Sequence, residues 1–183
     1  IKSAVSNLTT ILDDFLHVEK AEAGKVVVNW STFDLEIYCR EITDELKLLA
    51  KGSQKIVYSH HGTSNLVKLD KNLLKNCIIN LISNAIKYSG DDTRVEFTSR
   101  VDAVGITITV KDNGIGIPEE EQKHLFEAFF RAQNTGNIPG TGLGLNIAAR
   151  YVGLMGGTIS CSSALNEGTE FTIRFAYDQS TIN

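Results

Sequence analysis

Residues 71–88 carry the strongest periodic pattern in the chain, and this pattern constrains the fold more than any other feature. Hydrophobic residues recur there at spacings of three and four, which predicts a long helix with one buried face. The stripe consists of Leu73, Leu74, Cys77, Ile78, Leu81, Ile82, Ala85 and Ile86. The helix is therefore expected to lie in the core, and its opposite face is left for polar residues.

Strand and helix patterns surround this segment. Alternating hydrophobic residues predict one hairpin of residues 95–101 and 106–110 and a second hairpin of residues 158–163 and 169–175. Further short strands are expected at residues 26–28, 56–59 and 66–69, and further helices at residues 35–50, 118–130 and 143–155. Residues 132–140 are polar and contain glycine, which indicates a mobile loop. Helices mixed with hairpins, without regular βαβ alternation, indicate an α+β fold in the form of a two-layer α/β sandwich.

Residues 1–24 follow a different period and form a separate unit. Their hydrophobic residues alternate steps of three and four, which is typical of a coiled-coil or bundle seam. A helix this short needs a partner helix to be stable. We expect residues 1–24 to be the remnant of a dimerisation helix from a longer chain, and residues 25–183 to form the catalytic domain. A helix packed on its own domain is the alternative.

The composition excludes several classes of function. The 18 Lys and Arg against 22 Asp and Glu give a net charge of -4, which argues against a nucleic-acid partner bound through bulk charge. No hydrophobic run approaches the roughly 20 residues of a membrane span, so no direct membrane contact is expected. The 3 cysteines are far apart and lack metal-ligand spacing, which favours a reduced, cytoplasmic location. The full-length protein could still be anchored in a membrane.

A polar ridge lies opposite the hydrophobic stripe of the long helix. Asn80, Asn84 and Lys87 are spaced by four and three residues and so share one helical face. A carboxamide oxygen can coordinate Mg²⁺ without adding charge, while an ammonium group binds phosphate oxygens. A solvated helix face is the alternative for the ridge taken alone.

The segment DNGIGI at residues 112–117 directly follows a predicted strand. The carboxylate of Asp112 can accept a hydrogen bond from an amino group of a planar base, and the glycines let the backbone come close to it. Such a carboxylate favours adenine, which donates from its exocyclic group, over guanine, which presents a carbonyl group. A glycine-rich turn with an Asx cap is the alternative.

A third segment, GTGLGL at residues 140–145, leads into a predicted helix. It fits neither the P-loop nor the Rossmann spacing. A glycine-rich entry to a helix nevertheless exposes backbone N–H groups to an anion. The alternative is a tight loop that only begins the helix.

Together these segments resemble, in order, the motifs of sensor histidine kinases. Residues 80–89 resemble the N box, residues 112–117 the G1 box, residues 126–131 the F box and residues 140–145 the G2 box, and residues 168–171 are similar to the last motif of the family. The match runs from about Leu12 to Phe175. Four boxes in the family's order and spacing make this resemblance highly specific.

The resemblance implies an ATP-binding catalytic domain of the Bergerat type, with a mixed sheet, helices on one face, and ATP and Mg²⁺ as cofactors. By motif, Asn84 would bind Mg²⁺, and Asn80, Lys87 and Arg131 would act in catalysis beside it. Asp112 would hold the adenine amino group, and residues 132–140 would form a lid over ATP. The full set of residues implied to bind the nucleotide is Tyr88, Asp112, Gly114, Gly116, Ile117, Phe129, Gly140, Thr141, Gly142, Leu143, Gly144 and Thr169.

One feature departs from the family pattern. The phosphorylated histidine of the family lies on the first dimerisation helix, in a phrase that has no match here. His17, His60, His61 and His124 are expected to be surface or packing residues. The chain should therefore bind ATP without phosphorylating itself. The resemblance implies a His-bearing dimerisation domain of the same protein as acceptor, a homodimeric full-length protein, and a response-regulator Asp as the next acceptor.

The position four residues before Asn84 bears on the type of reaction. Related ATPases place a glutamate there to activate water, whereas this chain has Asn80, whose amide is no base near neutral pH. Transfer of the γ-phosphoryl group to a histidine is therefore favoured over hydrolysis. An ATPase of the same superfamily, a nucleotide-gated interaction module and a serine kinase are the alternatives.

Overall fold

A five-stranded mixed sheet forms one layer of the molecule in the computed structural model, which describes residues 24–177. The strands lie in the order β2 (Lys55–Gly62), β4 (Arg94–Asp102), β5 (Gly105–Asp112), β7 (Gly168–Ala176) and β6 (Thr158–Ala164). The β2–β4 pair is parallel, and the other pairs are antiparallel. The helix predicted for residues 1–24 falls almost entirely outside the described residues.

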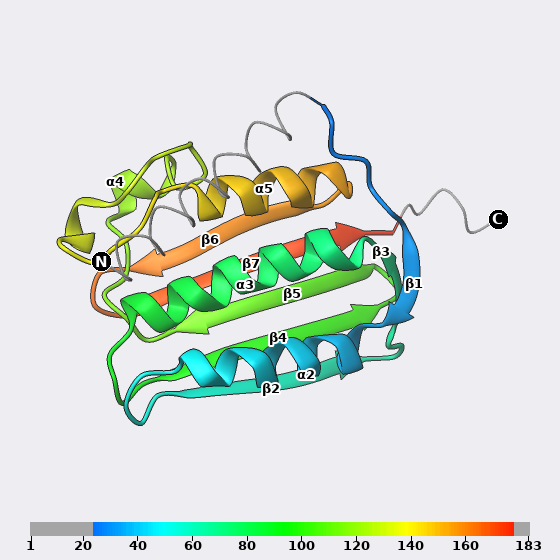
Figure 1. Ribbon diagram of the computed structural model, residues 1–183, viewed down its shortest axis with the longest axis horizontal. Helices are drawn as coiled ribbons and strands as arrows, with labels where there is room; N and C mark the ends of the chain where they lie inside the picture. Colours follow the sequence, from blue (N-terminus) through cyan, green and yellow to red (C-terminus); the bar gives the residue numbers. More distant parts are fainter. Residues whose placement is uncertain (1–23, 178–183) are drawn as a thin grey trace, which may run out of the picture.

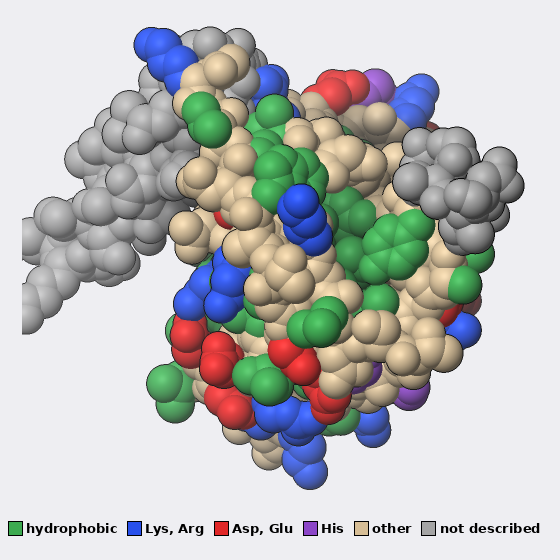
Figure 2. All heavy atoms as spheres, turned by 90° about the vertical axis from the view of Figure 1, so that its right-hand side faces the viewer, with side chains coloured by type: hydrophobic (Ala, Val, Ile, Leu, Met, Phe, Trp, Pro, Cys, Tyr) green, Lys and Arg blue, Asp and Glu red, His purple; other side chains and the backbone are tan. Residues whose placement is uncertain are grey.

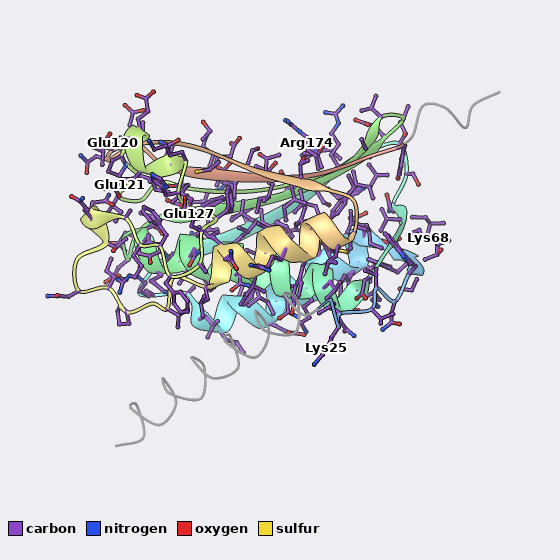
Figure 3. All side chains as sticks on the ribbon, turned by 90° about the horizontal axis from the view of Figure 1, so that it is seen from above. Lys25, Lys68, Glu120, Glu121, Glu127 and Arg174 are labelled. Carbon is purple, nitrogen blue, oxygen red and sulfur yellow. The ribbon has the colours of Figure 1, made fainter. Side chains whose placement is uncertain are left out.

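Three helices form the second layer. Figure 1 shows α2 (Leu35–Leu46), α3 (Lys71–Tyr88) and α5 (Gly144–Leu154) lying across the same face of the sheet, and Figure 3 shows the two layers from above. Short 3-10 turns extend α2 (η1, Lys47–Leu49) and lie in the loop before α5 (η2, Gln133–Thr135). The predicted two-layer α/β sandwich, with helices on one face of a mixed sheet, is confirmed.

The core lies between the layers because each strand turns alternate residues toward the helices. In β4, Val95, Phe97 and Val101 are buried, while Glu96 and Arg100 between them are exposed. Register pairs Phe97 with Val110 of β5, and Val110 with Phe171 of β7, so the hydrophobic rows continue across the sheet. Both predicted hairpins are therefore confirmed.

Helix α3 is the central helix and has the bounds that its periodicity predicted. All eight residues of its hydrophobic stripe are buried. Asp70 caps its N-terminus, with a side chain that is 3% exposed and accepts from Asn72 N at 2.9 Å and Leu73 N at 3.0 Å. The other oxygen of Asp70 accepts from Asn29 N at 2.7 Å, so this cap also fixes the segment that enters the domain.

Two local predictions were wrong. No strand forms at residues 26–28. Instead, β1 (Ser31–Asp34) pairs antiparallel with β3 (Leu66–Leu69). Val26 and Val28 are partly buried against the core but belong to no strand. The helix predicted for residues 118–130 is a single turn, α4 (Glu119–Gln122). The residues that follow form i→i+3 turns, such as His124 N to Glu121 O at 3.0 Å, and Phe129 has a positive φ of 64°, which a helix does not permit.

The end of the molecule opposite α4 exposes hydrophobic side chains among charged ones (Figure 2). Large hydrophobic residues exposed in this part of the fold include Trp30 and Leu66, beside or in the β1–β3 pair. None of the helices between residues 24 and 177 is long and hydrophobic enough to cross a bilayer. The thiols of Cys39 and Cys77 are buried, and that of Cys161 is half-buried; all three are free.

Candidate nucleotide-binding site

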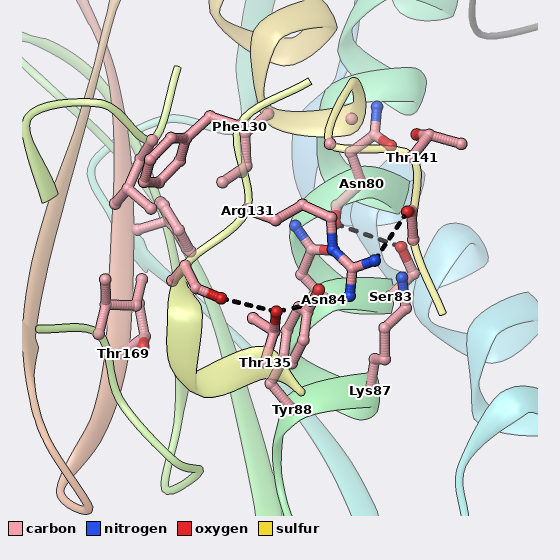
Figure 4. Close-up of a pocket in the computed structure, with 18 of the residues that line it drawn as sticks. Asn80, Ser83, Asn84, Lys87, Tyr88, Phe130, Arg131, Thr135, Thr141 and Thr169 are labelled. Atoms are coloured by element: carbon pink, nitrogen blue, oxygen red, sulfur yellow. Dashed lines mark hydrogen bonds between the residues drawn. The ribbon is translucent and has the colours of Figure 1, made fainter. Parts of the chain in front are cut away.

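A cavity of about 700 Å³ opens between α3, the loop after β5, the segment of residues 132–140, and β7 (Figure 4). We call residues 132–140 the lid and residues 112–117 the β5 loop. Residues from every predicted motif line the cavity. They are Asn80, Asn84, Lys87 and Tyr88 from α3; Asp112, Gly116 and Ile117 from the β5 loop; Arg131, Gly140, Thr141, Gly142 and Gly144 around the lid; and Thr169 from β7.

The wall formed by α3 is the polar ridge predicted from the sequence. Asn80, Asn84 and Lys87 face the cavity because the hydrophobic stripe on the opposite side of the helix is buried in the core. Asn76 and Ser83 extend the same ridge. The ridge offers amide, hydroxyl and ammonium groups, which together suit a polyphosphate.

Asp112 also lines the cavity and lies at the end of β5. Its side chain is 5% exposed and accepts a hydrogen bond from Gly114 N at 2.7 Å. Burial raises the pKa of this carboxyl to about 6, although hydrogen bonds from the backbone of Gly114 and Thr169 act in the opposite direction. Asp112 is thus mostly ionised at neutral pH, and a carboxylate has enough lone pairs to accept a further hydrogen bond from a ligand.

The two glycines of the β5 loop permit close backbone contacts. A Cβ on Gly114 would lie 2.4 Å from the carbonyl oxygen of Tyr88, so the loop rests directly on the end of α3. Gly116 has φ of 65°, and a Cβ there would lie 1.9 Å from Ala164 O. Only glycine satisfies both conditions at Gly116.

Side chains hold the lid in its own conformation and against the β5 loop. Arg131 donates to the carbonyl oxygens of Ile138 and, at 3.3 Å, Gly140, and to Thr135 Oγ1 at 3.4 Å. Asn134 Nδ2 donates to Gly116 O at 2.8 Å. Figure 4 shows the Arg131 side chain extending into the pocket toward Asn84 and Lys87. The Arg131 cation therefore lies in the same cavity as Asn84 and Lys87.

The glycine-rich segment after the lid approaches the ridge of α3. A Cβ on Gly140 would lie 3.5 Å from Lys87 Nζ and 3.6 Å from the Tyr88 hydroxyl. A Cβ on Gly144, the first residue of α5, would lie 2.8 Å from Asn80 Oδ1. Gly142 has φ of 73°, and a Cβ there would lie 2.6 Å from the backbone of Phe129. These contacts bring the two predicted phosphate-binding segments together.

Three predicted residues do not line the cavity. Gly114 packs against Asp112 and Tyr88 without lining the cavity itself. Leu143 is fully buried in the core, and Phe129 is 64% exposed. The neighbouring Phe130 lines the cavity instead. Further lining residues that sequence reasoning did not name are Asn76, Ile79, Ser83, Ile115, Leu125, Leu145, Ile147 and Phe171, while Ala132, Asn134, Thr135 and Pro139 line it from the predicted lid.

The histidines of the described chain lie away from the cavity. His60 contacts Ser99 Oγ through Nδ1 at 2.7 Å, and His61 contacts Ser59 Oγ at 3.3 Å. His124 is exposed and pairs with Glu127 at 2.6 Å. None of these three lines the cavity, while His17 lies outside the described residues.

No group of three or more His, Cys, Asp or Glu residues within positions 24–177 could hold a metal ion. The oxygen donors that line the cavity include the carboxamide of Asn84, the residue predicted to bind Mg²⁺. A single carboxamide fits Mg²⁺ that arrives with phosphate oxygens and water as its other ligands, because this ion usually keeps several waters and binds through few protein groups.

Comparison with known proteins identifies relatives for this site. Residues 69–179 match the model of the histidine kinase-, DNA gyrase B- and HSP90-like ATPase family. The chain is 34% identical to the sensor histidine kinase GacS of Pseudomonas protegens, over 94% of this chain and 20% of the relative. It is also 34% identical to the signal transduction histidine-protein kinase BarA of Escherichia coli, over 97% of this chain and 20% of the relative. The chain thus spans about a fifth of the length of these relatives.

Solved structures show the same fold. Full-length ShkA in complex with AMPPNP superposes with a TM-score of 0.81 at 26% identity, covering 93% of this chain and 36% of that one. The histidine kinase AdeS of Acinetobacter baumannii superposes with a TM-score of 0.75 at 25% identity, covering 96% of this chain and 81% of that one.

Proposed function

Because the chain belongs to the family of histidine kinase-, DNA gyrase B- and HSP90-like ATPases, we propose that it is the ATP-binding catalytic part of a two-component sensor histidine kinase. One observation carries this proposal. The buried carboxylate of Asp112 and the ridge of Asn80, Asn84 and Lys87 line a single cavity. One nucleotide can therefore contact both.

The Asp112 end of the cavity would bind the base. A carboxylate with a pKa of about 6 is ionised at pH 7 and accepts a hydrogen bond from the amino group of adenine. Guanine presents a carbonyl oxygen at the same position and would be repelled. Ile117 and Phe171 supply apolar walls for the ring, and Thr169 adds a hydroxyl beside the carboxylate.

The α3 end would bind the triphosphate. Lys87 and Arg131 would neutralise phosphate charge. Asn80, which lies next to Gly144, would donate a hydrogen bond to the phosphates. Asn84 would hold Mg²⁺, which when bound neutralises charge that develops between the phosphates. The lid residues above them would exclude water from the reacting phosphate.

The residues at this end favour transfer over hydrolysis. Asn80 stands where related ATPases carry a glutamate, and a carboxamide cannot take a proton from water near neutral pH. The described histidines lie outside the cavity. The acceptor would therefore be a histidine on the dimerisation domain of the full-length, homodimeric protein, with a response-regulator aspartate as the next acceptor.

Reconstitution tests this function. The chain is incubated with Mg-ATP labelled at the γ-phosphate, alone and with a separately produced dimerisation domain of its full-length protein. Acid-labile phosphohistidine should form only in the mixture, and the Asp112→Asn variant should form much less. Rapid steady release of phosphate by the chain alone would favour an ATPase. Nucleotide binding without transfer in either sample would favour a nucleotide-gated interaction module.

A further inference from the structure

Helix α3 ends inside the proposed site, and its final turn is capped by a segment far away in the sequence. Lys87 and Tyr88 are its last two residues, and the carbonyl groups of a last helical turn have no partner within the helix. Lys51 Nζ donates to the carbonyl oxygens of Lys87 at 3.2 Å and Ser89 at 3.3 Å. A positive charge at this end also complements the helix dipole.

Gln54 completes the cap. Its amide Nε2 lies within hydrogen-bond distance of Ile86 O at 3.3 Å, Ser89 Oγ at 2.8 Å and Gly90 O at 3.2 Å. The side chain is 6% exposed, so these contacts are made out of water. Gln54 also holds Lys51 in place, because Gln54 Oε1 accepts from Lys51 N at 3.3 Å and Gln54 N donates to Lys51 O at 2.8 Å.

The same helical turn is fastened to the β5 loop from its other side. Tyr88 O accepts from Ile115 N at 3.2 Å, and Gly114 packs directly against this carbonyl group. The end of α3 is thus held between residues 51–54 and the β5 loop. Neither Lys51 nor Gln54 lines the cavity, so they cannot bind the nucleotide directly from where they lie.

We propose that Lys51 and Gln54 are positioning residues of the nucleotide site. By capping the last turn of α3, they set the position of Lys87 and Tyr88 relative to Asp112, and so match the phosphate end of the cavity to its base end. This inference rests on the proposed function. It assigns a role in nucleotide affinity to a turn that holds the helix end through carbonyl groups and a hydroxyl.

Nucleotide affinity measured by calorimetry tests the role, with Mg-ATP and adenosine as the two ligands. Lys51→Met removes the cap and its charge, and Gln54→Met removes donors without changing charge. Each variant should bind Mg-ATP about tenfold more weakly, equivalent to about 1.4 kcal/mol. Adenosine affinity should stay within about twofold, because Asp112 is not displaced. Lys51→Arg should recover most of the Mg-ATP affinity, since a guanidinium can donate to both carbonyl oxygens.

Lys55→Met is the matched control, because it removes the same charge from an exposed residue at the start of β2. An equal loss in Lys55→Met and Lys51→Met would show a bulk charge effect and overturn the inference. Unchanged Mg-ATP affinity in a folded Lys51→Met variant, or equal losses for both ligands, would also overturn it. If the Gln54→Met variant does not fold, the Mg-ATP affinities of Lys51→Met and Lys51→Arg test the inference on their own. Failure of the unmodified chain to bind Mg-ATP would instead reject the proposed function.

Discussion

Acidification should release the nucleotide through protonation of Asp112. Burial raises the pKa of this carboxyl from 3.8 to about 6 in the folded protein. At pH 7.5 roughly 97% of the carboxyl groups are ionised, whereas at pH 5 roughly 9% are, as a pKa of about 6 requires. If only the carboxylate accepts from the adenine amino group, affinity should fall about tenfold between these two pH values.

The effect on folding has the opposite sign, which separates it from loss of binding. A carboxyl with a raised pKa destabilises the folded state when it is charged. That cost, about 3 kcal/mol for a change in pKa from 3.8 to about 6, is fully present above pH 6 and disappears as the pH falls toward 4. The Asp112 contribution to stability therefore improves over the range in which nucleotide binding weakens.

The assay is a titration of Mg-ATP by calorimetry from pH 5 to pH 8, on the unmodified chain and on Asp112→Asn. The variant should bind about 10- to 100-fold more weakly at pH 8, because it loses a hydrogen bond to a charged group worth about 1.5 to 3 kcal/mol. Titration of the phosphates themselves affects both proteins equally and cancels in the ratio of their affinities. A ratio that does not change between pH 5 and pH 8 would refute the assignment of Asp112 to the base.

Three further substitutions test other parts of the structure. Gly144→Ala should weaken Mg-ATP binding severalfold in calorimetry, because its methyl group displaces Asn80, while thermal stability is kept or gains up to about 1 kcal/mol. Leu81→Ala should cost about 2 to 5 kcal/mol in urea unfolding, since Leu81 is 0% exposed; a loss below 1 kcal/mol would contradict the packing. Asp70→Ala should lower the free energy of unfolding by about 2 kcal/mol through loss of the α3 cap, and Asp70→Asn should lower it less.

The local hydrophobic pattern was sufficient to predict a helix or strand wherever that element buries one whole face. The bounds of α3 follow from its sequence because Asp70 can begin a helix and the hydrophobic stripe stops at Ile86. The two hairpins are equally readable, since their strands alternate strictly and join neighbours in the chain. In each case a shift of one residue would expose hydrophobic groups, so the pattern leaves one solution.

Elements whose partners lie far away in the sequence were harder to predict. The valines at residues 26–28 have strand propensity but no strand beside them, whereas Ser31–Asp34 pairs with Leu66–Leu69. The turn after α4 depends on Phe129, which has a positive φ and whose backbone lies close to Gly142, beyond the other end of the lid. Propensity carries no information about either contact.

The polar residues of the site were easier to predict from the sequence than the other residues that line the cavity. Ser83 could have been found, because it lies three residues after Asn80 on the same ridge. The choice between Phe129 and Phe130 could not, because adjacent residues point in different directions and the backbone conformation decides which one enters the cavity. Lid residues such as Asn134 act through backbone groups of the β5 loop, and no sequence pattern identifies such partners.

The lid differs from the β5 loop and α3 in the free energy needed to displace it. The β5 loop is joined to the end of α3 by the hydrogen bond from Ile115 N to Tyr88 O, and Gln54 holds the same end of α3 through buried hydrogen bonds. The loss of one buried partner leaves polar groups unsatisfied at about 1 to 3 kcal/mol each. The lid is held by a few hydrogen bonds of Arg131, Gln133 and Asn134, of which those of Arg131 and Gln133 are exposed to solvent. A small number of exposed hydrogen bonds defines a segment of low local stability. We therefore expect the lid to open more readily than the contacts between the β5 loop and α3.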